Sequence, residues 1–156
     1  TSITGNTNAF AALKEAGEVV TWGFAGLGGD CSAVADRLAA GVTSITGSVM
    51  AFAALKGSGE VVTWGSASSG GDSRSVEDRL AAGVVSVTHN PAAFAAVKGA
   101  GEVVTWGSAR DGGDSCAVAG RLAAGVTSIT GSDSLFGRAF AALKDAGEVV
   151  TWGCAQ

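Results

Sequence analysis

Short runs of apolar and β-branched residues, separated by glycine, follow one another along the whole chain. Residues 42–46 contain one Val, one Ile, two Thr and one Ser, a composition that suits a pleated, half-buried surface and predicts a strand. Two further apolar runs, 51–56 and 60–64, are joined by residues 57–59, Gly-Ser-Gly. Because glycine readily adopts the positive φ of a tight turn, the pattern predicts a β-hairpin after the first strand.

The second strand of this hairpin has apolar residues on both of its faces. Side chains alternate along a strand, so Val61 and Thr63 share one face while Val62 and Trp64 share the other. We therefore expect both faces to be covered, and neighbouring copies of the same pattern to cover them.

The heptapeptide Gly-Glu-Val-Val-Thr-Trp-Gly identifies the chain as a tandem repeat. It occurs four times, at residues 17–23, 59–65, 101–107 and 147–153. The copies are 42, 42 and 46 residues apart, and the last spacing is longer by four residues because of an insertion in the loop 132–138. We predict a single repeat domain, 1–156, of four units: 1–41, 42–83, 84–125 and 126–156, the last of them incomplete.

A segment of small and polar residues follows each Trp-Gly. In the second unit this segment spans residues 70–83, has an Asp and a Ser placed to cap a helix, and ends at a glycine. Val76 and Leu80 are four residues apart and would share one side of a short amphipathic helix of about two turns. Each unit is then three strands plus a short helix. Such a unit cannot bury its apolar face alone, so the units must stack.

The motif residues resemble the repeat of the regulator-of-chromosome-condensation family, in which Gly-x-Val-x-x-Trp-Gly is followed by a four-residue loop and a further Gly. The second unit contains the corresponding residues Ile45, Gly47, Leu55, Gly59, Val61, Trp64, Gly65 and Gly70. The resemblance covers nearly the whole chain. It implies a β-propeller-like arrangement whose loops serve binding.

The chain departs from that family in residues and in number of units. Ala replaces the family's usual His, at Ala9, Ala51, Ala93 and Ala139, and Gly-Asp-Ser or Gly-Asp-Cys replaces its Gln-Leu-Gly. No nucleotide-exchange or chromatin role is therefore carried over. The family usually closes a ring of about seven blades, although propellers of about four also exist. We predict a mainly β, propeller-like fold of about four units, with an open, solenoid-like stack as the alternative.

Charge and hydropathy argue against two classes of partner. The chain has 10 basic and 14 acidic residues, a net charge of −4, and no run of Lys or Arg that could follow a phosphate backbone, so we expect no nucleic-acid partner. Its apolar runs are far shorter than the roughly 20 residues that span a bilayer, which predicts a soluble protein with no membrane span. The chain begins inside a repeat, without Met or a signal peptide, which is typical of a processed form or a segment of a longer protein.

Candidate chemical groups are few. Cys31, Cys116 and Cys154 lack the Cys-x-x-Cys spacing of a zinc site, and we interpret them as small fillers, with a Cys116–Cys154 bridge as the alternative. The single histidine, His89, replaces a strand-end glycine and is followed by Asn90 and Pro91, which favours a turn role. Asp30, Asp72 and Asp114 each follow two glycines. One carboxylate per unit supplies too few oxygens for calcium, so we expect helix capping.

Recurring Glu and Arg residues are placed to pair between strand and helix: Glu18, Glu60, Glu102 and Glu148 with Arg37, Arg79 and Arg121.

Two sets of residues are candidate binding residues. The first is the recurring tryptophans, whose regularity favours core packing but which could also form aromatic platforms for sugars: Trp22, Trp64, Trp106 and Trp152. The second belongs to the insertion, where apolar residues stand in a loop that the other units keep short and polar: Leu135, Phe136 and Arg138. Phe136 would either mark a contact with a partner or cover the open end of the last unit.

No Ser-His-Asp arrangement, phosphate-binding loop or metal cluster is evident, so we predict a protein that is not an enzyme and needs no cofactor or metal. The sequence favours a binding or scaffold module that docks a protein partner or a larger assembly, or assembles with itself through open repeat ends. The alternative is a carbohydrate-binding propeller with one Trp-lined site per unit.

Overall fold

The computed structural model describes residues 1–134 and 138–154, which form four separate three-stranded antiparallel sheets. Sheet 1 contains β1 (Ser2–Gly5), β2 (Ala9–Leu13) and β3 (Val19–Gly23); sheet 2 contains β4 (Val42–Gly47), β5 (Ala51–Lys56) and β6 (Val61–Gly65); sheet 3 contains β7 (Val84–His89), β8 (Ala93–Lys98) and β9 (Val103–Gly107); sheet 4 contains β10 (Val126–Gly131), β11 (Ala139–Lys144) and β12 (Val149–Gly153). The strands predicted for the second unit are confirmed, as is the mainly β repeat fold.

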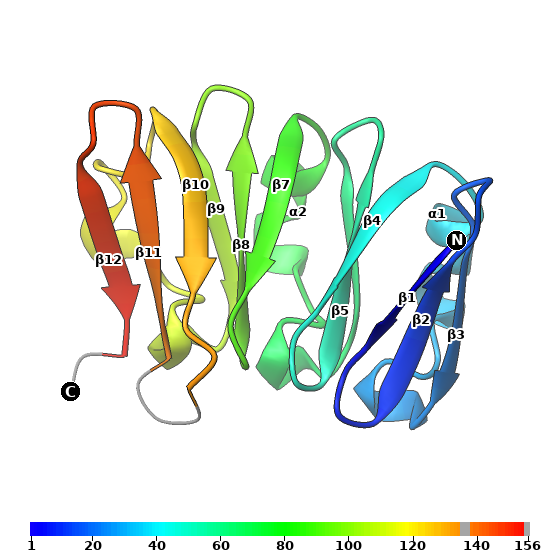
Figure 1. Ribbon diagram of the computed structural model, residues 1–156. Helices are drawn as coiled ribbons and strands as arrows, with labels where there is room; N and C mark the ends of the chain where they lie inside the picture. The colour runs from blue at the N-terminus through cyan, green and yellow to red at the C-terminus, as the bar shows by residue number, and fades with distance from the viewer. Residues whose placement is uncertain (135–137, 155–156) are drawn as a thin grey trace.

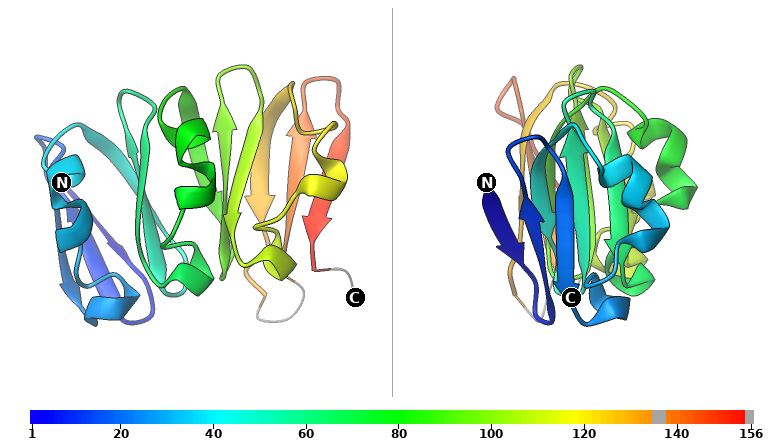
Figure 2. Two further views of the ribbon diagram at one scale, coloured as in Figure 1. Left: turned by 180° about the vertical axis from the view of Figure 1, so that it is seen from behind. Right: turned by 90° about the vertical axis from the view of Figure 1, so that its right-hand side faces the viewer.

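The four sheets stand side by side in a row, with sheet 1 and the N-terminus at one end and sheet 4 at the other (Figure 1). The first strands β1, β4, β7 and β10 lie along one side of the row, and the helical segments lie along the opposite side (Figure 2). Within the described residues the row does not close into a ring, so the arrangement is an open series of propeller-like blades.

The helical segments of the first two units have about the predicted length, but only their second half is α-helical. In the first two units a 3-10 turn runs directly into a single α-helical turn: Ser32–Val34 into α1 (Ala35–Leu38), and Arg74–Val76 into α2 (Glu77–Leu80). In the third unit the 3-10 turn Cys116–Val118 is followed by turns, at the point where Gly120 takes the place of an aspartate. Glycine lowers helix propensity, which explains why the α-helical turn is missing there. Further 3-10 turns follow the first three Trp-Gly pairs, at Ala25–Leu27, Ala67–Ser69 and Ala109–Asp111.

The apolar core is divided into three layers, each between two neighbouring sheets. The first junction, between sheets 1 and 2, combines Ala9, Ala11, Val19, Leu38, Val42, Phe52, Ala54, Val62 and Trp64. The next two junctions repeat this set around Phe94 and around Phe140. Val62 and Trp64 belong to the first junction and Val61 to the second, so neighbouring sheets cover both faces of sheet 2, as expected from the alternation of apolar residues.

Each junction also contains a glycine that lets two units approach closely. Gly28 has φ +103°, and a Cβ on it would lie 2.6 Å from the ring of Phe52. Its carbonyl oxygen accepts a 3.1 Å hydrogen bond from Nε1 of the buried Trp64. Gly70 and Gly112 do the same for Trp106 and Trp152. The absence of a side chain on this glycine therefore leaves room for the Phe ring. Its carbonyl oxygen accepts the hydrogen bond of the indole N–H, whose burial without a partner would destabilise the fold.

Candidate protein-docking face

The outer face of sheet 1 is apolar and exposed, whereas the corresponding face of every other sheet is covered. We call this the leading face and define it as Ile3, Phe10, Ala12, Val20 and Trp22. The exposed fractions of Phe10, Val20 and Trp22 are 46%, 39% and 44%. Their counterparts in sheet 2, Phe52, Val62 and Trp64, are 0%, 0% and 4% exposed. The same side chains thus form a core layer in one unit and an open surface in another.

The aromatic pair on the leading face is held in one arrangement by the sheet beneath it. Phe10 and Trp22 lie directly opposite each other on β2 and β3, and their rings stack with centroids 5.6 Å apart and planes 18° apart. The side chains of Ala9 and Ala11 point to the other side of β2, where they are fully buried against sheet 2. The pair is therefore a rigid platform, and a partner that covers it need not immobilise flexible side chains.

The opposite end of the row exposes a different set of side chains. We call this the trailing face and define it as Ala139, Ala141, Leu143, Val149 and Thr151 of sheet 4. Leu143 is 45% exposed and Val149 is 54% exposed. Their counterparts in sheet 2, Leu55 and Val61, pack into the junction with sheet 3. The two ends of the row therefore present the two different sides of a junction.

A polar ion pair crosses each internal junction. Arg37 of the first unit contacts Glu60 of the second, with Nη2 and Oε1 2.8 Å apart, and the equivalent pairs Arg79–Glu102 and Arg121–Glu148 have separations of 2.7 Å. The predicted ion pairs between the recurring Glu and Arg residues are confirmed for these three pairs. Each pair joins two successive units. Arg121 lowers the pKa of Glu148 through their hydrogen bond. In the first unit Glu18 pairs instead with Lys14 of its own hairpin, at 2.9 Å.

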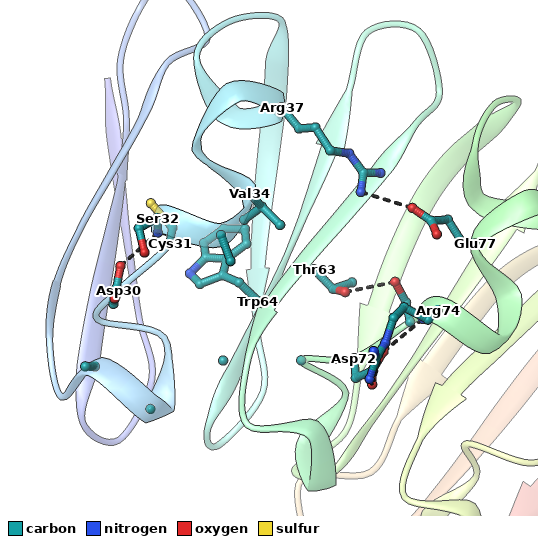
Figure 3. A pocket seen from close by; sticks show the side chains of 16 residues that line it. Asp30, Cys31, Ser32, Val34, Arg37, Thr63, Trp64, Asp72, Arg74 and Glu77 are labelled. Carbon is teal, nitrogen blue, oxygen red and sulfur yellow. Dashed lines mark hydrogen bonds and ion pairs between the residues drawn. The ribbon is translucent and has the colours of Figure 1, made fainter.

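A groove of about 580 Å³ lies between the helical segments of the first two units (Figure 3). Its polar side chains bond mainly to one another. Arg37 contacts Glu77 at 3.3 Å across the groove, and Thr63 Oγ1 lies 2.9 Å from the hydroxyl of Ser73. Arg74 forms hydrogen bonds to Asp72, which lower the pKa of that carboxyl to about 2. Because these groups are already paired, the groove offers no converging set of free groups for catalysis among the described residues.

The three glycine-flanked aspartates hold the start of the helical segments. Asp30 Oδ1 accepts a 2.8 Å hydrogen bond from the backbone N–H of Ser32, and this bond lowers the pKa of Asp30. Asp72 and Asp114 accept the same bond from Arg74 and Cys116. The aspartates therefore close a turn one residue before the N-cap positions, whose own side chains make no capping bond, and the expected helix capping is replaced by an Asx turn. In the part of the chain that the structure describes, no group of three or more His, Cys, Asp or Glu residues is placed to hold a metal ion.

The predicted binding residues fall into different environments. Trp22 is exposed on the leading face, whereas Trp64, Trp106 and Trp152 are 4%, 2% and 8% exposed and bond to glycine carbonyls. A sugar-binding site on each tryptophan is not supported, because the rings of these three are covered by the preceding sheet. Arg138 lies 3.6 Å from Asp111 in an ion pair. Leu135 and Phe136 lie outside the described residues.

Among the described residues, His89 and the cysteines do not belong to any group of side chains that could hold a metal ion. His89 is at the end of β7, opposite Phe94, with ring centroids 6.4 Å apart. Among the described residues the three cysteines form no disulfide bond, and a hydrogen bond to Asp114 raises the pKa of the Cys116 thiol. A thiol with a raised pKa is a weaker nucleophile at neutral pH.

Sequence reasoning missed the residue that follows each first strand. Asn90 is fully buried; its amide nitrogen donates to the carbonyl of Asp111 at 2.6 Å and its oxygen accepts from Ala92 and Ala93. Asn6 forms the same set in the first unit, and Ser48 reaches the carbonyl of Ser69 at 2.8 Å. The signal was present in the alternation of Asn and Ser at positions 6, 48, 90 and 132.

No helix in the described part of the chain is long and apolar enough to cross a membrane. No protein-family model matches the sequence, and no curated protein matches it either.

Solved structures do share the fold. Prp20p of Saccharomyces cerevisiae, in a crystal structure described with its binding to Gsp1p and histones, superimposes with a TM-score of 0.66 and 17% identity over 99% of this chain and 44% of that one. The same yeast RCC1 protein bound to Kap60 gives a TM-score of 0.65, with 17% identity over 97% of this chain and 43% of that one. Human WBSCR16 gives 0.54, with 21% identity over 98% of this chain and 47% of that one. The chain thus spans less than half the length of each of these structures, and its fold is that of an RCC1-like repeat, as the sequence motifs indicated.

Proposed function

We propose that this chain is a non-catalytic protein-docking module and that its leading face is the docking site. The observation that carries the proposal is the exposure of Phe10 and Trp22, whose counterparts in the other three sheets are at most 8% exposed. In each internal junction the equivalent Phe and Trp are covered by the side chains of the preceding sheet. The face therefore has the shape and polarity of a surface that packs against another protein surface.

The energetics support this role. Covering a large apolar side chain completely stabilises a complex by about 1.5–3 kcal/mol relative to leaving it in water. Phe10 and Trp22 are each nearly half exposed, so covering them would add on the order of 1 kcal/mol each. Rigid aromatic residues at the centre of an apolar patch are also the residues that dominate binding energy in protein interfaces.

The similar structures point in the same direction. The two yeast Prp20 structures are described with protein partners: Gsp1p, histones and Kap60. A blade-type repeat that docks proteins is thus compatible with the fold, and the open ends of the row admit either a different protein or another copy of the chain.

Site-specific photo-crosslinking tests the proposal. A benzophenone amino acid replaces Phe10 on the leading face in one version and Val85 in a control version. Val85 lies on β7 in the middle of the row and is 60% exposed, so it offers an accessible apolar site away from both ends.

Each version is irradiated in a cell extract, and the adducts are identified by mass spectrometry. We expect position 10 to give specific protein adducts, of this chain or of another protein, that position 85 does not give. Equal labelling at the two positions would mean that the leading face is an ordinary surface and would overturn the proposal.

A further inference from the structure

The two ends of the row carry the two complementary sides of the junction that the chain forms internally three times. The leading side of a junction consists of Phe, Ala, Val and Trp, as in Phe52, Ala54, Val62 and Trp64. The trailing side consists of two Ala and a Val, as in Ala51, Ala53 and Val61. These sides meet between sheets 1 and 2, between sheets 2 and 3, and between sheets 3 and 4.

The unpaired faces reproduce these sides residue by residue. On the leading face Phe10 is paired with Trp22 and Ala12 with Val20, in the same strand register as Phe52 with Trp64 and Ala54 with Val62. On the trailing face stand Ala139, Ala141 and Val149, which have the residue types and strand positions of Ala51, Ala53 and Val61. Leu143 on the trailing face likewise matches Leu55.

We propose that the partner of the leading face is the trailing face of a second copy of this chain. This inference rests on the protein-docking function proposed above and names its partner. The two faces differ from each other, so the contact is head to tail. A contact of this kind leaves one free leading face and one free trailing face in every dimer, and it continues into longer assemblies or closes into a ring.

The contact between copies is weaker than an internal junction. Inside the chain, each sheet after the first also receives a leucine, an arginine and a glycine carbonyl from the helical segment and loop of the unit before it; for sheet 2 these are Leu38, Arg37 and Gly28. The described residues contain three such segments, and each one already contacts the sheet that follows it. Among the described residues, the contact between copies is therefore made by the sheets. Association should be reversible and depend on concentration.

Three matched substitutions of Val by Asp test the inference in the full chain. Val20→Asp places a charge on the leading face, Val149→Asp places one on the trailing face, and Val85→Asp is the control. All three valines are already partly exposed, at 39%, 54% and 60%, so each variant should fold, which circular dichroism verifies. Sedimentation velocity over a range of concentrations then reports the mass of each purified protein.

We expect the wild-type chain and Val85→Asp to increase in mass with concentration. Val20→Asp and Val149→Asp should each associate more weakly by on the order of 30-fold, the effect typical of disrupting an anchor residue. An equimolar mixture of these two variants should form a dimer and nothing larger, because it contains one intact leading face and one intact trailing face that fit each other.

Two results would overturn the inference. A wild-type chain that stays monomeric at every concentration excludes the second copy as partner. If Val20→Asp is monomeric but Val149→Asp associates like wild type, two leading faces meet each other and the contact is not head to tail. In either case a distinct protein crosslinked from position 10 would leave the docking function standing, so the two proposals fail separately.

Discussion

Sheets 1 and 2 carry the same aromatic pair on the same strands, yet one pair is a surface and the other is a core. Phe52 and Trp64 are 0% and 4% exposed, whereas Phe10 and Trp22 are 46% and 44% exposed. The ring geometry hardly differs, with centroids 5.4 Å apart in sheet 2 and 5.6 Å apart in sheet 1. What differs is the preceding unit that covers sheet 2. In a repeat protein, the role of a residue is set by its place in the row as well as by its sequence.

The largest expected contrast concerns the phenylalanines. Phe52→Ala removes a fully buried ring from the first junction and should destabilise the chain by about 3–5 kcal/mol, because it loses apolar burial and leaves a cavity. Phe10→Ala should lower the free energy of unfolding by about 1 kcal/mol or less, since that ring is nearly half in water. Urea denaturation of the two variants measures the difference. Equal losses would mean that the leading face is covered in solution.

A second contrast compares the two asparagines after the first strands. Asn90→Ala leaves the carbonyl of Asp111 and two backbone N–H groups without their partner in a fully buried site. We expect a loss of about 2 kcal/mol. Asn6→Ala breaks the same bonds in the half-buried site of the first unit, where water can replace the amide, and should have about half the effect. Thermal unfolding monitored by circular dichroism ranks the two, and the reverse order would contradict this reading.

The smallest contrast concerns the glutamates of the hairpins. Glu60 is contacted by Arg37 of the preceding unit and has a side chain 24% exposed, whereas Glu18 is 43% exposed and pairs only within its own hairpin. Glu60→Gln should destabilise the chain by about 1 kcal/mol and Glu18→Gln by a few tenths, because solvent screens the exposed pair. Added salt should reduce both effects. Repeating the urea titrations at low and high salt checks this, and a larger loss for Glu18→Gln would be inconsistent with it.

Much of the fold could be read from the sequence because the information is local. The glycines and β-branched runs predict the strands and hairpins, and the fourfold heptapeptide predicts the number of units. The helix type was harder to predict from the sequence. A 3-10 turn followed by a single α-helical turn replaces the expected two-turn helix, and in the third unit, where Gly120 stands, the α-helical turn is absent. The candidate site was harder still. Trp22 and Trp64 have the same sequence neighbours on their strand, so no local pattern can tell which one is covered.

The exposure of a single tryptophan also gives the chain a distinctive optical property. Trp64, Trp106 and Trp152 are buried and donate to glycine carbonyls, whereas Trp22 is the one that water reaches. Soluble quenchers would therefore act mainly on the emission of Trp22, while the other three provide an internal reference. Any molecule that binds to the leading face would protect the fluorescence of Trp22 from the quencher. Occupancy of this face can therefore be measured by quenching in the unlabelled protein.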